Sequence, residues 1–154
     1  MEISGTAGAL KQFRRTAWRF EQTFHTPLKK LPPFVAVILS ALGPIETGSL
    51  TIDRVVFDPR KLIELLGKSS IEIELTHNLT LVAAGEVESR ELLQAALSES
   101  VDFLLVPTPK RFVIYADHDE YTTFLSMTKS HLNRVAKALV EHGFRRAEGY
   151  KRRS

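Results

Sequence analysis

The sequence predicts an α+β protein in which helices pack on a largely antiparallel sheet of about five strands. Residues 71–76 alternate apolar and polar side chains, which is typical of a half-buried strand. Turn signals at His77-Asn78 and at 107–110 connect apolar segments as hairpins, and hairpins join antiparallel strands. Apolar residues at helical spacing lie between these segments. The predicted order after residue 49 is β-α-β-β-α-β-β-α.

The first part of the chain is predicted to be a helical N-terminal segment, residues 1–42. Leu10, Phe13, Phe20 and Phe24 follow helical spacing and favour one amphipathic helix over residues 6–25. A short buried helix is expected over 34–42, after Pro32-Pro33. Residues 43–48 contain glycine and proline and are expected to form a linker.

The remainder, residues 49–144, is predicted to form the α+β core of a single domain that spans 1–154. Strands are expected at 49–57, 71–76, 79–84, 101–106 and 111–116, and helices at 59–66 and 89–98. A long C-terminal helix is expected from Asp117 to about His142, with Gly143 ending it. Residues 145–154 are expected to form a basic flexible tail.

Composition excludes several classes of protein. The 154 residues are 44% hydrophobic and 25% charged, which is ordinary for a globular domain. Without cysteine, the chain has no disulfides, thiolate metal sites or cysteine nucleophile. The N-terminus lacks the pattern of a signal peptide, and the longest apolar stretch, 34–42, is too short to cross a membrane. We therefore expect a cytoplasmic protein that does not bind membranes.

Charge is unevenly distributed along the chain. Residues 1–30 contain six basic and two acidic side chains, residues 31–109 five and eleven, and residues 110–154 ten and five. The basic ends could lie over the acidic middle, within one chain or between chains, or could simply be solvated. Alternatively, they could form a basic face for nucleic acid or another polyanion.

A carboxylate cluster follows the last predicted strand. Asp117, His118, Asp119 and Glu120 come directly after an apolar run. Two aspartates one residue apart can bind Mg²⁺ or Mn²⁺ for phosphoryl transfer, with His118 as a ligand or general base. Such a site predicts a further Asp or Glu nearby. The alternative is a capping box, in which Asp117 and Glu120 cap the last helix and no cofactor is needed.

A basic tail follows the last predicted helix. Nucleic-acid binding would use its cations, which can track phosphates, and truncation after Phe144 would abolish it. The candidate residues are Arg145, Arg146, Lys151, Arg152 and Arg153.

The leading hypothesis is a small binding protein without evident catalytic machinery. It rests on the segment Phe103–Val106, which is apolar on both faces and must therefore be covered twice. The second layer is either the N-terminal segment or a partner, so a protein partner or a homo-oligomer is expected. The first alternative is a metal-dependent phosphoryl-transfer or nuclease-like enzyme centred on Asp117 and Asp119. The second is nucleic-acid binding through the last helix and tail.

Overall fold

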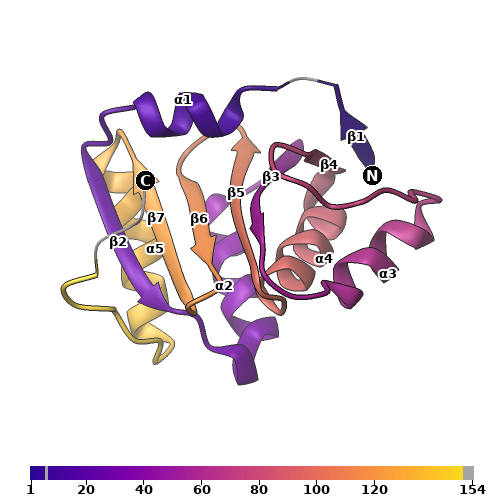
Figure 1. The fold of residues 1–154 in the computed structure, drawn as a ribbon. Coiled ribbons are helices and arrows are strands. Elements are labelled where there is room, and N and C mark those ends of the chain that lie inside the picture. The colour runs from indigo at the N-terminus through magenta and orange to yellow at the C-terminus, as the bar shows by residue number, and fades with distance from the viewer. Residues whose placement is uncertain (6, 151–154) are drawn as a thin grey trace.

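The computed structural model describes residues 1–5 and 7–150 and contains a seven-stranded sheet with helices on both faces (Figure 1). The strands are β1 (Glu2–Ser4), β2 (Phe20–His25), β3 (Thr47–Val55), β4 (Thr80–Ala84), β5 (Val101–Thr108), β6 (Val113–Asp117) and β7 (Tyr121–Ser126). The α-helices are α1 (Ala9–Arg15), α2 (Leu31–Leu42), α3 (Arg60–Lys68), α4 (Gly85–Leu97) and α5 (Lys129–Glu141), and a 3₁₀ turn, η1 (Leu28–Lys30), precedes α2. None of the described helices is long and apolar enough to span a membrane.

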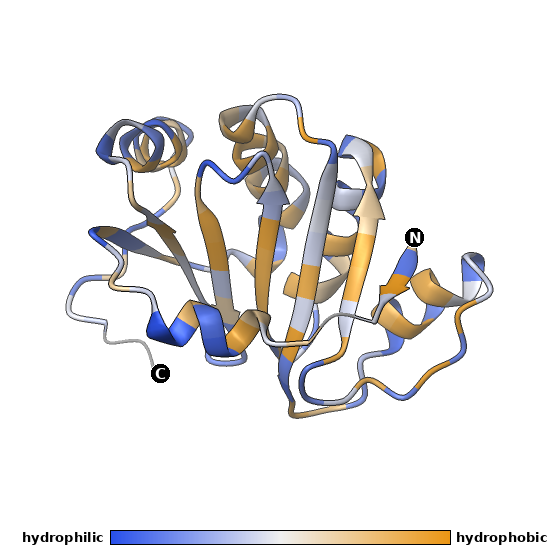
Figure 2. Ribbon diagram, turned by 90° about the horizontal axis from the view of Figure 1, so that it is seen from above, coloured by the Kyte–Doolittle hydropathy of each residue, from blue (hydrophilic) through white to orange (hydrophobic). Residues whose placement is uncertain are grey.

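All neighbouring strands are antiparallel, in the order β1-β4-β3-β5-β6-β7-β2. The predicted α+β class is therefore confirmed, whereas the strand number and order differ from the prediction. Helices α2, α4 and α5 cover one face, here called the inner face, and α1 crosses the other, the outer face (Figure 2). Helix α3 packs against α4.

The main hydrophobic core lies between the inner face and its helices. Side chains alternate along each strand, so every second residue of the central strands enters this core. Leu50, Ile52, Phe103, Leu105 and Phe124 are fully buried there. Helix α2 is the most apolar helix and buries eight of its twelve residues, which places it against both α4 and α5.

The predicted helix over residues 6–25 was wrong in its second half. Helix α1 ends at Arg15, Thr16 is extended, and Phe20–His25 pairs with Tyr121–Ser126 as strand β2. Phe20 and Phe24 are four residues apart, a spacing that fits one face of a strand as well as one face of a helix. Pairing with β7 decides between them. Together with β1, this places two strands in the expected helical N-terminal segment.

The predicted strand at 71–76 was also wrong, because those residues form a loop. Strand β4, its expected hairpin partner, pairs with β1 on one side and β3 on the other. No pairing position next to β4 remains for residues 71–76. Ile73, expected to be buried, is 40% exposed.

The long C-terminal helix was the third error. Residues 121–126 form strand β7, and the helix begins only at Lys129. Tyr121, Phe124 and Leu125 fit a helical stripe, but β7 is buried on both faces, and Thr122 and Thr123 are buried as well. β-branched and aromatic residues favour a strand in this setting. The capping box is consequently absent, because Asp117–Glu120 forms the turn between β6 and β7.

The N-terminal residues close both edges of the sheet. Strand β1 forms one edge, α1 crosses the outer face, and β2 forms the other edge (Figure 1). The start of the C-terminal tail then lies along β2. The amide of His25 donates to the carbonyl of Arg145, and the amide of Ala147 donates to the carbonyl of Thr23. The sheet edge formed by β2 is thereby covered by the chain itself.

Candidate functional site

Helix α1 lies between two hollows of the outer face. One, here called the α1 groove, contains the outward-facing residues Ser49, Leu104 and Val113. The other, the acidic pocket, contains Asp53 and Asp102, which are also outward-facing residues of β3 and β5. Every second side chain of a strand points to the same face, so β3 and β5 contribute residues to both hollows at different positions along their length.

Packing and an ion pair hold α1 in place. Leu10 and Phe13 of α1 are buried against Leu104 and three further side chains of the outer face, and Phe13 stacks on Tyr115 with ring centroids 5.5 Å apart. Arg14 pairs with Asp53 at 2.6 Å. Helix α1 is thus the second layer over β5 that the sequence predicted. The Arg14–Asp53 pair also shows that the basic N-terminal part and the acidic middle meet within one chain.

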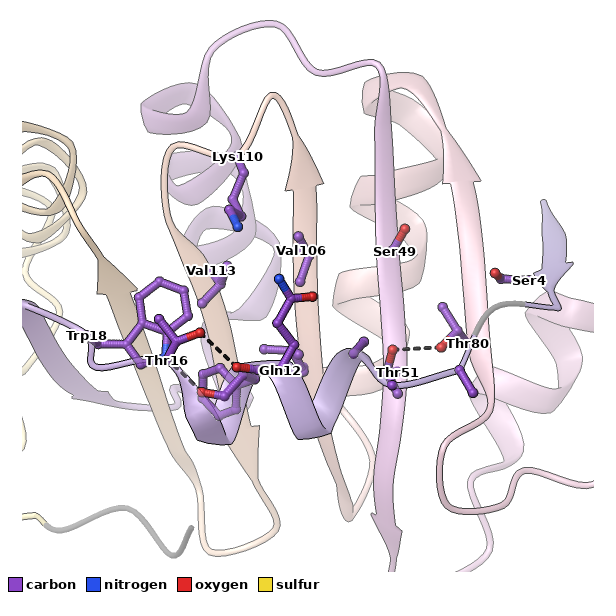
Figure 3. A pocket seen from close by; sticks show the side chains of 15 residues that line it. Ser4, Gln12, Thr16, Trp18, Ser49, Thr51, Thr80, Val106, Lys110 and Val113 are labelled. Carbon is purple, nitrogen blue, oxygen red and sulfur yellow. Dashed lines mark hydrogen bonds between the residues drawn. The ribbon is translucent and has the colours of Figure 1, made fainter.

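The α1 groove has a volume of about 400 Å³, which lies in the range of small-molecule sites. Figure 3 shows it as a hollow on the face of β3, β5 and β6 beside α1, with Trp18 at one end and Lys110 above. Gln12 projects from α1 toward Val106 (Figure 3). The lining residues are Ser4, Ala7, Gly8, Ala9, Gln12, Phe13, Thr16, Trp18, Ser49, Thr51, Thr80, Leu104, Val106, Lys110 and Val113.

Some polar groups of the groove are already bonded within the protein. The hydroxyls of Thr51 and Thr80 share a 2.8 Å hydrogen bond at the groove floor. The Thr16 hydroxyl donates to the Gln12 carbonyl at 2.7 Å, and the Trp18 indole N–H donates to the Phe13 carbonyl at 3.1 Å. These bonds fix the shape of the groove without occupying it.

Other polar groups of the groove have unused bonding capacity. Within the part of the chain that the structure describes, the amide of Gln12, the hydroxyl of Ser49 and the ammonium of Lys110 have no hydrogen bond or ion pair. They come from α1, β3 and the turn between β5 and β6. Groups from three distant parts of the sequence therefore converge on one hollow with an apolar floor.

The acidic pocket is smaller, about 230 Å³, and contains most of the residues predicted for a metal site. Asp117, His118 and Asp119 line it, whereas Glu120 does not. The remaining lining residues are Arg14, Asp53, Arg54, Asp102, Tyr115 and Tyr150. Asp53 of β3 and Asp102 of β5 line the same pocket as Asp117 and Asp119.

An aspartate–histidine pair is the chemically distinctive feature of this pocket. Nδ1 of His118 lies 2.8 Å from Oδ1 of Asp102, and the same oxygen accepts the backbone N–H of His118 at 2.6 Å. Nε2 lies 3.5 Å from Oδ1 of Asp119. Asp102 is 8% exposed, so this carboxylate is buried and orients the imidazole. In a protein, such a pair can position a histidine for acid–base chemistry.

The rest of the predicted cluster shapes the turn. Oδ1 of Asp117 accepts the backbone N–H groups of Asp119 at 2.9 Å and Tyr121 at 3.2 Å. The hydroxyl of Tyr150 donates to Oδ2 of Asp117. Glu120 has a φ of 67°, the left-handed conformation that ends many three-residue hairpin loops. Oδ1 of Asp117 thus stabilises the hairpin turn, and Oδ2 attaches the C-terminal tail to it.

The described side chains of the acidic pocket do not form a metal-binding group. Within residues 1–5 and 7–150, no group of three or more histidine and carboxylate side chains is placed to hold a metal ion. Asp102 instead bonds to His118, and Asp117 to the turn and Tyr150.

Two tyrosines that line the pocket have raised pKa values. Burial raises the pKa of Tyr115, and its 2.5 Å hydrogen bond to Asp53 raises it further. Burial likewise raises the pKa of Tyr150, followed by its hydrogen bond to Asp117 and by the nearby negative charges of Asp102 and Asp119. Both hydroxyls therefore remain protonated donors well above neutral pH.

The predicted nucleic-acid residues are only partly placed. Arg145 and Arg146 are exposed, and their backbones lie along β2, where Arg146 forms a bridge with Phe24. Lys151, Arg152 and Arg153 lie outside the described residues.

Sequence reasoning missed the residues that other strands contribute. It identified Asp117, His118 and Asp119, which are consecutive, but not Asp53 or Asp102. It also missed the α1 groove. The available signal was the alternation within β3 and β5, where Ser49, Thr51 and Asp53 share one face. This alternation shows which residues share one face of a strand, but it does not show which other strands or helices lie beside that face.

Comparison with known proteins gave no matching family model, no similar curated protein and no similar solved structure. The geometry of the two hollows is therefore the basis for a functional proposal.

Proposed function

We propose that this protein acts by binding, and that the α1 groove is its binding site. The observation that carries the proposal is the convergence of unbonded polar groups on an apolar floor. Gln12, Ser49 and Lys110 surround a surface formed by Leu104, Val106 and Val113. Concave sites that combine apolar walls with a few directed polar groups are typical of ligand binding.

The acidic pocket is a weaker candidate for the binding site, because its carboxylates are already bonded within the protein. Its carboxylates are bonded to Arg14, Tyr115, His118 and Tyr150. Stabilising the hairpin, α1 and the tail is a sufficient role for these contacts. The α1 groove, by contrast, retains donors and a cation that folding does not use.

The occupant that the sequence favoured was a protein partner or a second copy of the chain, in the cytoplasm. The exposed large apolar side chains are spread over strands, helices and loops and include Ile3, Phe57, Val87 and Met127. The α1 groove is the place where apolar and polar groups occur together, so a partner chain would also be expected to use it.

Binding of anilinonaphthalene sulfonate, an anionic aromatic dye, tests the proposal. Trp18, the only tryptophan, lines the groove, so energy transfer from Trp18 to the bound dye reports its position. Ser49→Tyr should fill the groove and abolish the signal, whereas Ser130→Tyr, at an exposed position of α5, should not. Equal dye binding by both variants would refute the groove as the site. Light scattering of the same variants reports self-association, which Ser49→Tyr should disrupt if a second copy occupies the groove.

A second candidate function, acid–base chemistry, is favoured by the Asp102–His118 pair. The metal-dependent phosphoryl-transfer activity predicted for Asp117 and Asp119 would use the same pocket, although no group of three or more histidine and carboxylate side chains among the described residues is placed to hold a metal ion. Calorimetric titration with Mg²⁺ and Mn²⁺ tests the metal, with Asp119→Asn as the variant that should lose binding. If neither the wild type nor Asp119→Asn releases or absorbs heat on titration with these metals, a metal-dependent enzyme is rejected.

Nucleic-acid binding also remains a prediction. The structure shows that truncation after Phe144 is not a clean test of it. Truncation after Phe144 would remove Ala147, which bonds to β2, and Tyr150, which bonds to Asp117. Loss of binding could then reflect damage to the fold. Replacing the exposed side chains of Arg145 and Arg146 by glutamine keeps these backbone contacts. If the wild type and this variant bind DNA and RNA equally, and salt does not affect the binding, this function is rejected.

A further inference from the structure

We propose that the ligand of the α1 groove is a small monocarboxylate with an apolar body. The carboxylate would bind Lys110, and the apolar body would lie against Val106 and Trp18. This inference rests on the proposed function, because it names the chemical class that the same groove accepts.

The charge of the α1 groove favours an anionic ligand. Lys110 is the only ionisable side chain among the described residues that line the groove. The aspartates Asp53 and Asp102 belong to the acidic pocket instead. Lys110 also lacks an ion pair within the described chain. An incoming anion would therefore meet an ammonium that no protein carboxylate neutralises.

The single positive charge of the groove favours a carboxylate over a more highly charged group. One ammonium, the amide of Gln12 and the hydroxyl of Ser49 are the unbonded polar side chains identified in the groove. A carboxylate carries one charge and two acceptor oxygens, which such a set can satisfy. A phosphate dianion would retain an uncompensated charge in this hollow.

The floor and one end of the groove suit an apolar body. Ala9, Trp18 and Val106 are partly buried and provide the accessible apolar surface of the groove, whereas Leu104 and Val113 lie beneath them and are 1% exposed. Trp18 stands at the end of this surface, packed against Phe13 at 5.8 Å between ring centroids. Burying a hydrocarbon chain or ring here would remove apolar surface from water on both molecules.

The test compares three probes that share one body and differ in charge: phenylbutyrate, phenylbutanol and phenylbutylamine. Quenching of Trp18 fluorescence measures the affinity of each. For the wild type we expect the acid to bind roughly tenfold more tightly than the alcohol, because a charge-assisted hydrogen bond contributes about that factor. The amine should bind more weakly than the alcohol.

Two lysine variants separate a specific contact from general charge. Lys110→Met keeps a long apolar side chain and removes the ammonium, so the acid should fall to the affinity of the alcohol, whose own affinity should not change. Lys129→Met is the matched control, because Lys129 is exposed on α5 and does not line the groove. It lowers the net charge equally and should leave the preference for the acid intact.

The outcomes distinguish the inference from the proposed function. Equal binding of all three probes, abolished by Ser49→Tyr, would show that the groove binds ligands but would overturn the monocarboxylate assignment. A preference for the acid that survives Lys110→Met would also overturn it. Failure of the three probes and of the dye to bind would reject both the inference and the proposed function.

Discussion

Arg14 and Asp53 form an ion pair across 39 residues of sequence, with Nη2 of the arginine 2.6 Å from Oδ2 of the aspartate. The same Asp53 oxygen accepts the hydroxyl of Tyr115 at 2.5 Å. One carboxylate of β3 thus links α1 to β6. Because the Asp53 side chain is 13% exposed, its carboxylate interacts mainly with these partners rather than with water.

Replacing Arg14 by glutamine should lower the free energy of unfolding by about 1 kcal/mol, since a partly exposed, charge-assisted contact is lost. Urea denaturation followed by Trp18 fluorescence measures the change. Arg15→Gln is the control, because Arg15 is exposed on the same helix. Equal destabilisation by the two variants would mean that the Arg14–Asp53 pair does not hold α1.

Replacing Glu120 by glycine should raise the free energy of unfolding by about 0.5–1 kcal/mol. Glu120 has a φ of 67°, and glycine adopts this conformation without the steric cost of a Cβ atom. Glu120→Ala, which retains Cβ, should give no such gain. A destabilising glycine would contradict the hairpin turn and would agree with the helix that the sequence predicted at this position.

Gly48 and Ser89 should show energetic coupling. A Cβ atom on Gly48 would lie 2.8 Å from Oγ of Ser89, which is fully buried and has no hydrogen-bond partner in the described chain. Gly48→Ala alone should destabilise the protein by about 1 kcal/mol through this overlap. Ser89→Ala alone should stabilise it by a similar amount, about 1 kcal/mol, because an unsatisfied buried hydroxyl is removed.

In the double variant, part of the overlap at Gly48 is relieved, so its stability should exceed the sum of the single effects. The four proteins form a double-mutant cycle that chemical denaturation can measure. Strict additivity would show that the two residues do not press on each other.

Alkaline pH should weaken the fold through Tyr115 and Tyr150. The pKa of each hydroxyl is raised above its unfolded value of 10.0, so the folded state retains protons that the unfolded state releases. The stability from this difference is complete below that value and is lost as the pH rises above it. Urea midpoints measured across this range should fall with pH. Tyr115→Phe combined with Tyr150→Phe should flatten the fall, and an unchanged slope would contradict the assignment.

Local sequence patterns predicted the elements whose neighbours are close in the chain. The helices expected over 34–42 and 59–66 correspond to α2 and α3 to within three residues, because proline marks the start of each and Gly43 marks the end of α2. The β5–β6 hairpin was likewise predicted from apolar runs around a proline-containing turn.

Pairing between distant segments was beyond those patterns. Phe20 and Phe24 fit either a helix or a strand, and only the position of β7 makes them a strand. The candidate site shows the same division. Consecutive residues such as Asp117 and His118 were identified, whereas Asp102, which orients His118, lies 16 residues away on a neighbouring strand.

The pairing of β2 with β7 also has a consequence for synthesis of the chain. Thr23 lies opposite Thr123, and their hydroxyls share a 2.8 Å hydrogen bond across 100 residues. On the ribosome, β2 emerges about 100 residues before its partner β7. Contacts of this separation also slow folding in free solution. The nascent chain must therefore keep Phe20 and Phe24 without their β7 partner until residues 121–126 have emerged, and a chaperone could bind them during this interval.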